Sequence, residues 1–157
     1  MRTFVSCSLS ETEKYIISIL SMQLIEIECI LSCTFKSSKK SILDNYYYTN
    51  EINSSHLFIG LISKQGSNRE EVIKDYKYAR SVKIPSLLLI EKTVTIKGKL
   101  KNVIRFDRKN HETSVNEIKN YIQEFKTIEP YTDDTLAWFL GGTSLITLIA
   151  LLSNYKK

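Results

Sequence analysis

Short apolar segments alternate with amphipathic segments over the first 126 residues of the chain. Residues 3–8 alternate between polar and apolar side chains, whereas residues 56–63 and 86–91 are nearly continuous apolar runs. Continuous runs of this length are typical of strands that are buried on both faces of a parallel sheet. The stretches between the runs repeat apolar residues at helical spacing, and Ser10 with Glu13 forms a capping-box signature at the start of the first stretch.

These patterns predict five strands and four helices in strict alternation. The expected strands are 3–8, 27–35, 56–63, 86–91 and 102–106, and the expected helices are 10–24, 38–53, 69–82 and 114–125. Such alternation predicts an α/β fold, here a flavodoxin-like five-stranded parallel sheet with helices on both faces, joined by right-handed crossovers. We expect residues 56–63 at the centre of the sheet, residues 102–106 at an edge, and Pro85 to end the third helix.

The last part of the chain has a different pattern. Residues 127–134 form a short acidic linker, and residues 135–155 carry no charge. As a helix, the nineteen residues of 135–153 would span about 28 Å, roughly the hydrocarbon thickness of a bilayer. Trp138 and Tyr155 suit the two membrane interfaces.

We therefore expect an α/β domain over residues 1–126, a linker, and an apolar helix over residues 135–155. The start of the chain does not resemble a signal peptide, which favours a cytoplasmic domain associated with a membrane through this helix. The alternative is a helix that is buried, or one that assembles the chain into a homo-oligomer. Ala137 and Gly141 would give such a helix a face of small residues.

Composition adds a basic segment to this picture and removes some kinds of site. The formal net charge is +5, and residues 92–109 alone carry seven basic side chains against one acid. Such a segment attracts phosphates or anionic lipid, or it is an exposed loop kept soluble by lysines; the lack of interleaved aromatic residues disfavours nucleic acid. The three cysteines and two histidines have no metal or disulfide spacing, so we expect a reducing cytosol, buried thiols such as Cys7, no metal and no resident cofactor.

Candidate binding residues follow the first expected strand. In an open parallel sheet, ligands bind at the carboxyl ends of the strands. There the chain reads Ser6-Cys7-Ser8-Leu9-Ser10, a run of hydroxyls that leads into a helix N-terminus. The amides and dipole of a helix N-terminus favour an anionic group such as a diphosphate, although Ser10 is explained equally well as a helix cap.

Two acids follow the central strand. Glu71 and Asp75 are four residues apart, so they lie one turn apart on the same face of the expected helix. Two such carboxylates could divide labour, one as a general base or stabiliser of a cation and the other as a fixed charge. The alternative is a solvated helix face on which they pair with Lys74 and Lys77.

Two stretches of the chain resemble the TIR-like superfamily, in particular its bacterial and archaeal TIR-like domains and their relatives among nucleoside deoxyribosyltransferases. They are TFVSCSLSETEK, and HLFIGLIS followed by VIKDYKYARSVKIPSLLLIE. In that family the second stretch is an apolar strand, a loop with Ser, a helix with an acid followed by Tyr and Ala, and a strand led by Pro. The resemblance covers residues 2–125 and implies a TIR-like fold for them.

The resemblance implies that the catalytic acid of the family falls on Asp75, directly before Tyr76 and four residues before Ala79. In members that are enzymes, this carboxylate helps to break the bond between nicotinamide and ribose in NAD, which gives ADP-ribose or a cyclised product. A fixed carboxylate would stabilise the ribosyl cation that develops beside the departing base. The other residues expected to line the nucleotide are Ser6, Ser8 and Ser10 after the first strand, and Lys64, Ser67 and Arg69 before the third helix.

The acid of the family is Glu, and Asp75 is shorter by one methylene. Either Glu71 takes the catalytic role from one turn away, or the site binds a nucleotide signal without turning it over and the apolar tail acts as a membrane-disrupting effector. Nucleoside deoxyribosyl transfer is a third option for the same fold and acid. The leading expectation is a protein of prokaryotic antiviral defence or stress signalling that takes NAD as its substrate.

Overall fold

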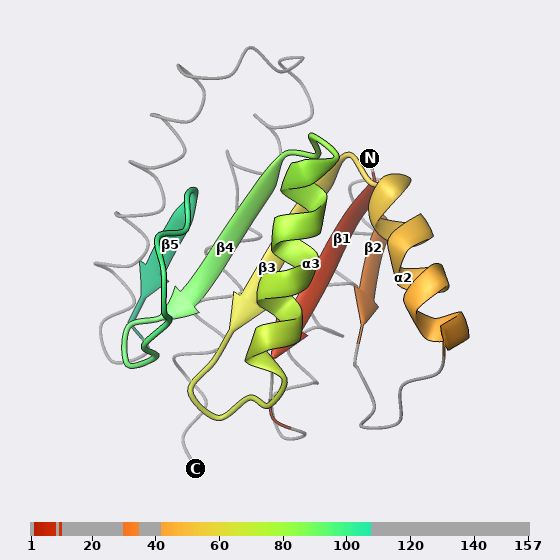
Figure 1. The fold of residues 1–157 in the computed structure, drawn as a ribbon. Coiled ribbons are helices and arrows are strands. Elements are labelled where there is room, and N and C mark those ends of the chain that lie inside the picture. Colours follow the sequence, from red (N-terminus) through yellow and green to blue (C-terminus); the bar gives the residue numbers. More distant parts are fainter. Residues whose placement is uncertain (1, 9, 11–29, 35–41, 108–157) are drawn as a thin grey trace.

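A computed structural model describes residues 2–8, 10, 30–34 and 42–107 of the chain. In this part of the chain, five parallel strands form one sheet in the order β2-β1-β3-β4-β5 (Figure 1). The strands are β1 (Arg2–Ser8), β2 (Ile30–Thr34), β3 (Leu57–Ile62), β4 (Ser86–Glu91) and β5 (Val103–Phe106), and the helices are α2 (Ile42–Asn53) and α3 (Arg69–Ser81). The predicted α/β fold with a parallel sheet is confirmed, with β3 at its centre and β5 at one edge.

The central strands are those without a polar face. Every residue of β3 and of β4 is buried, as the continuous apolar runs predicted. β3 pairs with β1 on one side and with β4 on the other, in a register that places Gly60 between Ser6 and Leu88. The middle of the sheet is therefore fixed by burial on both faces, because a slip of one residue would exchange all of its side chains between the two faces.

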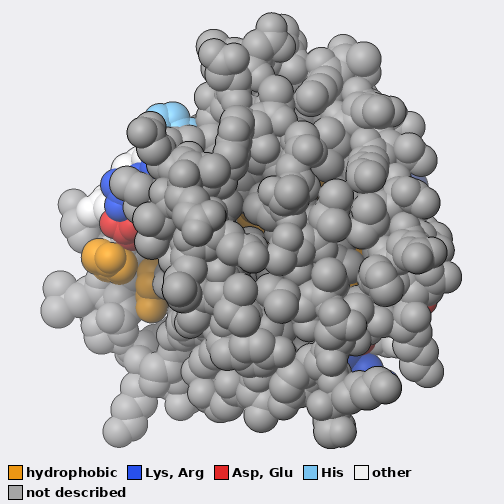
Figure 2. All heavy atoms as spheres, turned by 180° about the vertical axis from the view of Figure 1, so that it is seen from behind, with side chains coloured by type: hydrophobic (Ala, Val, Ile, Leu, Met, Phe, Trp, Pro, Cys, Tyr) orange, Lys and Arg blue, Asp and Glu red, His pale blue; other side chains and the backbone are white. Residues whose placement is uncertain are grey.

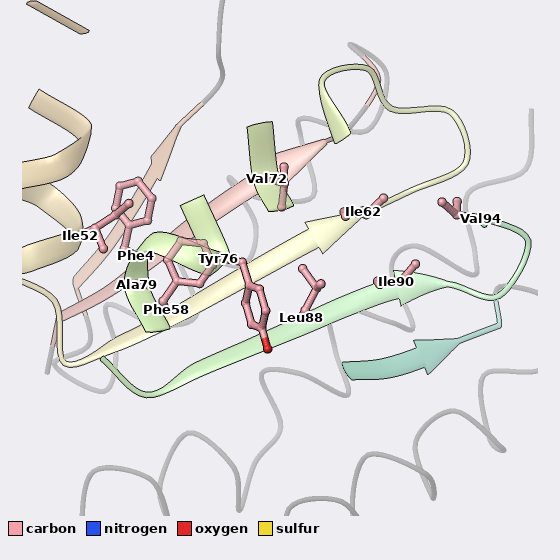
Figure 3. Packing of buried hydrophobic residues seen from close by; sticks show 10 residues of the cluster. All are labelled: Phe4, Ile52, Phe58, Ile62, Val72, Tyr76, Ala79, Leu88, Ile90 and Val94. Carbon is pink, nitrogen blue, oxygen red and sulfur yellow. The ribbon is translucent and has the colours of Figure 1, made fainter. Parts of the chain in front are cut away.

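The two described helices lie against the same face of the sheet (Figure 1). Ile52 of α2 joins a core cluster that also contains Phe4 and Phe58 of the sheet (Figure 3). The contribution of α3 to this cluster comes from positions three and four apart, Val72, Tyr76 and Ala79. The rings of Phe4 and Phe58 stack with centroids 5.9 Å apart, and the ring of Tyr76 lies 6.4 Å from that of Phe58.

Several predicted elements lie outside the described residues. These are the helices expected at 10–24 and 114–125, the linker 127–134 and the apolar segment 135–155. The prediction of helices on both faces is therefore tested on one face alone. Within the described part of the chain, no helix combines the length and the hydropathy that a membrane crossing requires.

A glycine at the centre of β3 allows α3 to approach the sheet closely. A Cβ atom at Gly60 would lie 2.5 Å from Cδ1 of Leu88 and 3.2 Å from Cγ1 of Val72. Both distances are shorter than a normal van der Waals contact, so the side chains of Leu88 and Val72 would have to shift to admit any larger residue here. The missing side chain brings the inner face of α3 onto β3 and β1.

The amino-terminal edge of the sheet is held by polar contacts. The guanidinium of Arg2 donates to both carboxylate oxygens of Glu51, at 2.8 and 2.7 Å, and the backbone N–H of Arg2 donates to Nδ1 of His56 at 3.1 Å. Figure 2, which views the molecule from behind, shows histidine, basic and acidic side chains near one margin. These contacts tie the start of β1 to the end of α2, and a partly exposed ion pair of this kind contributes at most about 1 kcal/mol.

The end of α3 is a Schellman motif with lysine at the left-handed position. The N–H of Lys83 donates to the carbonyl of Arg80 at 3.1 Å, and that of Ile84 donates to the carbonyl of Ala79 at 2.9 Å. Lys83 has φ 62°, where glycine is the usual residue. The helix ends at Ser81, one residue before the expected end at residue 82, and this turn reverses the chain before Pro85.

Replacing Lys83 by glycine is expected to stabilise the protein by about 0.5–1 kcal/mol, because it removes the strain of a side chain at positive φ. The free energy of unfolding in urea measures the effect. Lys83→Ala is the matched control, since it removes the same charge but keeps Cβ. An equal gain from Lys83→Ala would assign the effect to charge and contradict the prediction.

Candidate functional site

The carboxyl ends of β1, β3 and β4 lie side by side, and the polar residues of this edge surround the start of α3. β1 contributes Ser6 and Ser8, which alternate with Cys7 and therefore lie on the face covered by α3. β3 is followed by the loop 63–68, which leads into α3. The parallel topology thus brings together the residues that the sequence placed after the first and third strands.

A buried hydrogen bond joins the first two of these elements. The hydroxyl of Ser6 donates to Oδ2 of Asp75 at 2.7 Å, and Asp75 is only 8% exposed. Asp75 therefore does not belong to a solvated helix face, which corrects that alternative for this residue. A hydroxyl donor compensates part of the cost of removing a carboxylate from water, and it fixes the direction of the other oxygen, Oδ1.

The second predicted acid, Glu71, is half-buried. α3 runs antiparallel to the strands, so Glu71 lies one turn nearer to the carboxyl edge than Asp75 does. In the same direction β1 advances from Ser6 to Ser8. The two acids of α3 are thus spaced toward the carboxyl edge in the same direction as the two hydroxyls of β1. The described hydrogen bond between the two pairs is the one from Ser6 to Asp75.

Ser8 is the least satisfied polar residue of this edge. It is 1% exposed, and its hydroxyl has no hydrogen-bond partner among the described residues. An unsatisfied buried hydroxyl costs about 1–3 kcal/mol, and in a native structure such a group calls for an explanation, a binding role among others. Ser8 is thus a group through which this edge could bind a ligand.

A glycine closes the loop 63–68 over Ser8. A Cβ atom at Gly66 would lie 1.9 Å from the carbonyl oxygen of Ser8 and 2.5 Å from its Oγ. The backbone N–H of Gly66 also donates to the hydroxyl of Ser63 at 3.0 Å, and the N–H of Ser63 donates to the carbonyl of Ser8 at 3.2 Å. Only glycine allows the loop this close approach to β1.

Glu91 belongs to this edge although no local pattern predicted it. This last residue of β4 is 6% exposed, and its carboxylate accepts the backbone N–H of Lys64 at 2.6 Å and the hydroxyl of Thr93 at 3.2 Å. Glu91 thus positions the start of the loop that leads to α3. A single acid at the end of an otherwise apolar strand was the available signal.

The remaining predicted binding residues have different surroundings. Lys64 and Ser67 are exposed in the loop, and Ser10 is half-buried beyond the end of β1. The guanidinium of Arg69 donates to the carbonyl of Lys64, while its buried Nε has no partner within the part of the chain that the structure describes. The side chain of Arg69 therefore contacts the backbone of the loop that precedes it.

Cys7 is half-buried, so the expectation of a buried thiol is wrong for this residue. Its side chain alternates with Ser6 and Ser8 and belongs to the opposite face of the sheet. Among the described residues, no group of three or more His, Cys, Asp or Glu side chains could hold a metal ion.

Replacing Gly66 by alanine is expected to destabilise the protein by about 2 kcal/mol or more, because the new methyl group would meet the backbone of β1. Gly98→Ala is the control, because the space around its Cβ is open and the strain of a side chain at φ 94° is its only cost. We expect that control to cost about 1 kcal/mol. Urea denaturation of both variants measures the difference, and equal losses would show that the contact with Ser8 is not tight.

The geometry thus brings Ser6, Asp75 and Ser8 together, and it adds Glu91 as a support of the loop. No protein-family model, no curated protein and no solved structure matches the chain. What the site does is therefore inferred from these contacts and from the sequence.

Proposed function

We propose that the α/β domain binds NAD at the carboxyl edge of β1 and β3 and uses Asp75 to break the bond between nicotinamide and ribose. In this reaction the C1′–N bond breaks, and its electron pair leaves with neutral nicotinamide. Water then adds to C1′ and loses a proton, which gives ADP-ribose; attack by a nitrogen of the adenine instead gives a cyclised product. The protein must therefore stabilise a positive charge that develops on the ribose.

The observation that carries the proposal is the hydrogen bond between Ser6 and Asp75. It holds a carboxylate in a largely water-free position, with one oxygen engaged by the hydroxyl at 2.7 Å. A fixed negative charge in a site of low dielectric stabilises a nearby cation more strongly than a solvated one does. Ser6 would act as a positioning residue, because it orients the carboxylate and does not itself meet the ribosyl cation.

Other groups of this edge would bind the rest of the nucleotide. The hydroxyl of Ser8, which is buried and unsatisfied, would donate to a ribose or phosphate oxygen. Lys64 and Ser67 are exposed in the loop and would contact the diphosphate, with Ser10 on the side of β1. Arg69 would hold the loop in place through the carbonyl of Lys64. Glu71, one turn closer to the edge, would receive the proton of the attacking water.

The alternative is a domain that binds a nucleotide signal without turning it over. The observation that favours it is the depth of Asp75, which at 8% exposure leaves little of the carboxylate open to a ligand. In that case the residues 135–153, which lie outside the described part of the chain, would be the effector in the membrane. The role in prokaryotic defence or stress signalling, the membrane anchor and the homo-oligomer remain proposals that rest on the sequence.

We expect purified full-length protein to release nicotinamide when it is incubated with NAD. The released nicotinamide is measured by chromatography. Asp75→Asn keeps the size of the side chain but removes its charge, and we expect it to lower the rate on the order of a hundredfold or more. Glu71→Gln should lower the rate less, about tenfold or more, by removing a base. Glu70→Gln is the control, because Glu70 is an exposed acid of the same helix, and its rate should be unchanged.

Two results would contradict the enzymatic proposal. One is an Asp75→Asn protein that releases nicotinamide as fast as the unsubstituted one. The other is a protein that NAD or ADP-ribose stabilises against thermal unfolding but that releases no nicotinamide at any concentration of protein. The second result would establish the alternative of a nucleotide-binding module.

A further inference from the structure

The connection from β4 to β5 crosses the sheet without a helix. Parallel neighbours need a crossover connection, which is usually an α-helix. Here residues 92–102 form this connection, and they contain turns and irregular backbone only (Figure 1). We call residues 92–102 the basic loop, because they include four lysines and no acid.

The basic loop is fixed to the domain at both ends. Val94 is 3% exposed and belongs to the core cluster, where it lies beyond Ile90 (Figure 3). The hydroxyl of Tyr76 donates to the carbonyl of Lys101, and the side-chain amide of Asn102 donates to the carbonyl of Ser86 at 3.3 Å. The loop therefore presents its lysines from a defined position.

A cavity lies beneath this loop, where a crossover helix would otherwise cover β4 and β5. Its volume is about 580 Å³, within the range of sites for small ligands. It is lined by four aliphatic residues, one glycine and three cations: Ile90, Ile96, Leu100, Val103, Gly98, Lys99, Lys101 and Arg105. The aliphatic residues form apolar walls and the cations carry the positive charge of its lining.

The lysines of the loop face the solvent. Lys97, Lys99 and Lys101 are exposed, and Gly98 separates the first two with a φ of 94°. Apolar walls beside several cations match a ligand with an anionic head and an apolar body. A free phosphate would leave the walls unused, and a nucleic acid would find no aromatic side chain in the loop on which to stack a base.

We propose that the basic loop and its cavity form a docking surface for an anionic phospholipid membrane. The lysines contact the phosphate headgroups, and the aliphatic walls contact the upper part of an acyl chain. This surface orients the domain on the bilayer, and it depends neither on catalysis at Asp75 nor on insertion of the apolar tail.

The test compares two kinds of vesicle. Full-length protein is sedimented with vesicles of phosphatidylcholine alone, and with vesicles of phosphatidylcholine and phosphatidylglycerol in roughly equal parts. The ratio of the two partition coefficients isolates the electrostatic contribution, because an apolar tail would insert into both. Each lysine at an anionic surface favours binding about fivefold, so the triple change Lys97→Ala, Lys99→Ala and Lys101→Ala should lower the ratio about tenfold to a hundredfold.

A matched variant removes the same charge elsewhere. Lys74, Lys77 and Lys83 are exposed on or after α3, and their replacement by alanine should leave the ratio unchanged. An equal ratio for the unsubstituted protein and the loop variant would overturn the proposal, as would an equal loss in the α3 variant. Competition by glycerol phosphate as strong as that by vesicles would assign the site to a free phosphate. Loss of binding to a DNA duplex, with the vesicle ratio unchanged, would assign it to nucleic acid.

Discussion

The close packing of α3 on β1 and β3 is the constraint on which the candidate site depends. Gly60 removes the side chain that would separate Val72 from the sheet, and Asp75, one turn further along α3, then comes within 2.7 Å of the hydroxyl of Ser6. A larger residue at Gly60 would press on the side chains of Val72 and Leu88, so the contact between α3 and the sheet would have to readjust. The core and the site are therefore parts of one packing arrangement, in which the apolar contacts set the geometry and the polar groups use it.

The acidic and basic side chains of the domain differ in burial. Two acids of the carboxyl edge are buried: Asp75 accepts a hydrogen bond from a hydroxyl, and Glu91 accepts one from a backbone amide and one from a second hydroxyl. The lysines of the loop after β4 are exposed on the surface. The described part of the domain thus has buried acids at the carboxyl ends of its strands and exposed lysines in the loop after β4.

The parts of this arrangement that depend on local patterns of apolar residues could be predicted from the sequence. The apolar runs at 56–63 and 86–91 predicted the buried strands β3 and β4, and helical spacing predicted the inner face of α3. The contact of Ser6 with Asp75 spans 69 residues, and no spacing rule brings those two together; the expected topology placed them only at the same edge. Glu91 was missed because its role depends on the position of a backbone amide in another loop. The end of α3 was predicted to within one residue, whereas the turn with Lys83 at positive φ that follows it leaves no signal in the sequence.

The strand pairs of the sheet differ in the length of chain between them, and therefore in the entropy that is lost when the pair forms. Leu88 pairs with Val103 across a short stretch of chain, whereas Thr3 of β1 must find Leu57 of β3 across more than three times that distance along the chain. The entropic cost of closure grows with the length of the intervening chain, so pairing β1 with β3 costs more than pairing β1 with β2 or β3 with β4, whose separations along the chain are equal to each other. The site joins the two halves of the sheet, because Ser6 lies on β1 and Asp75 lies on the helix after β3. It therefore exists only when β1 has paired with β3.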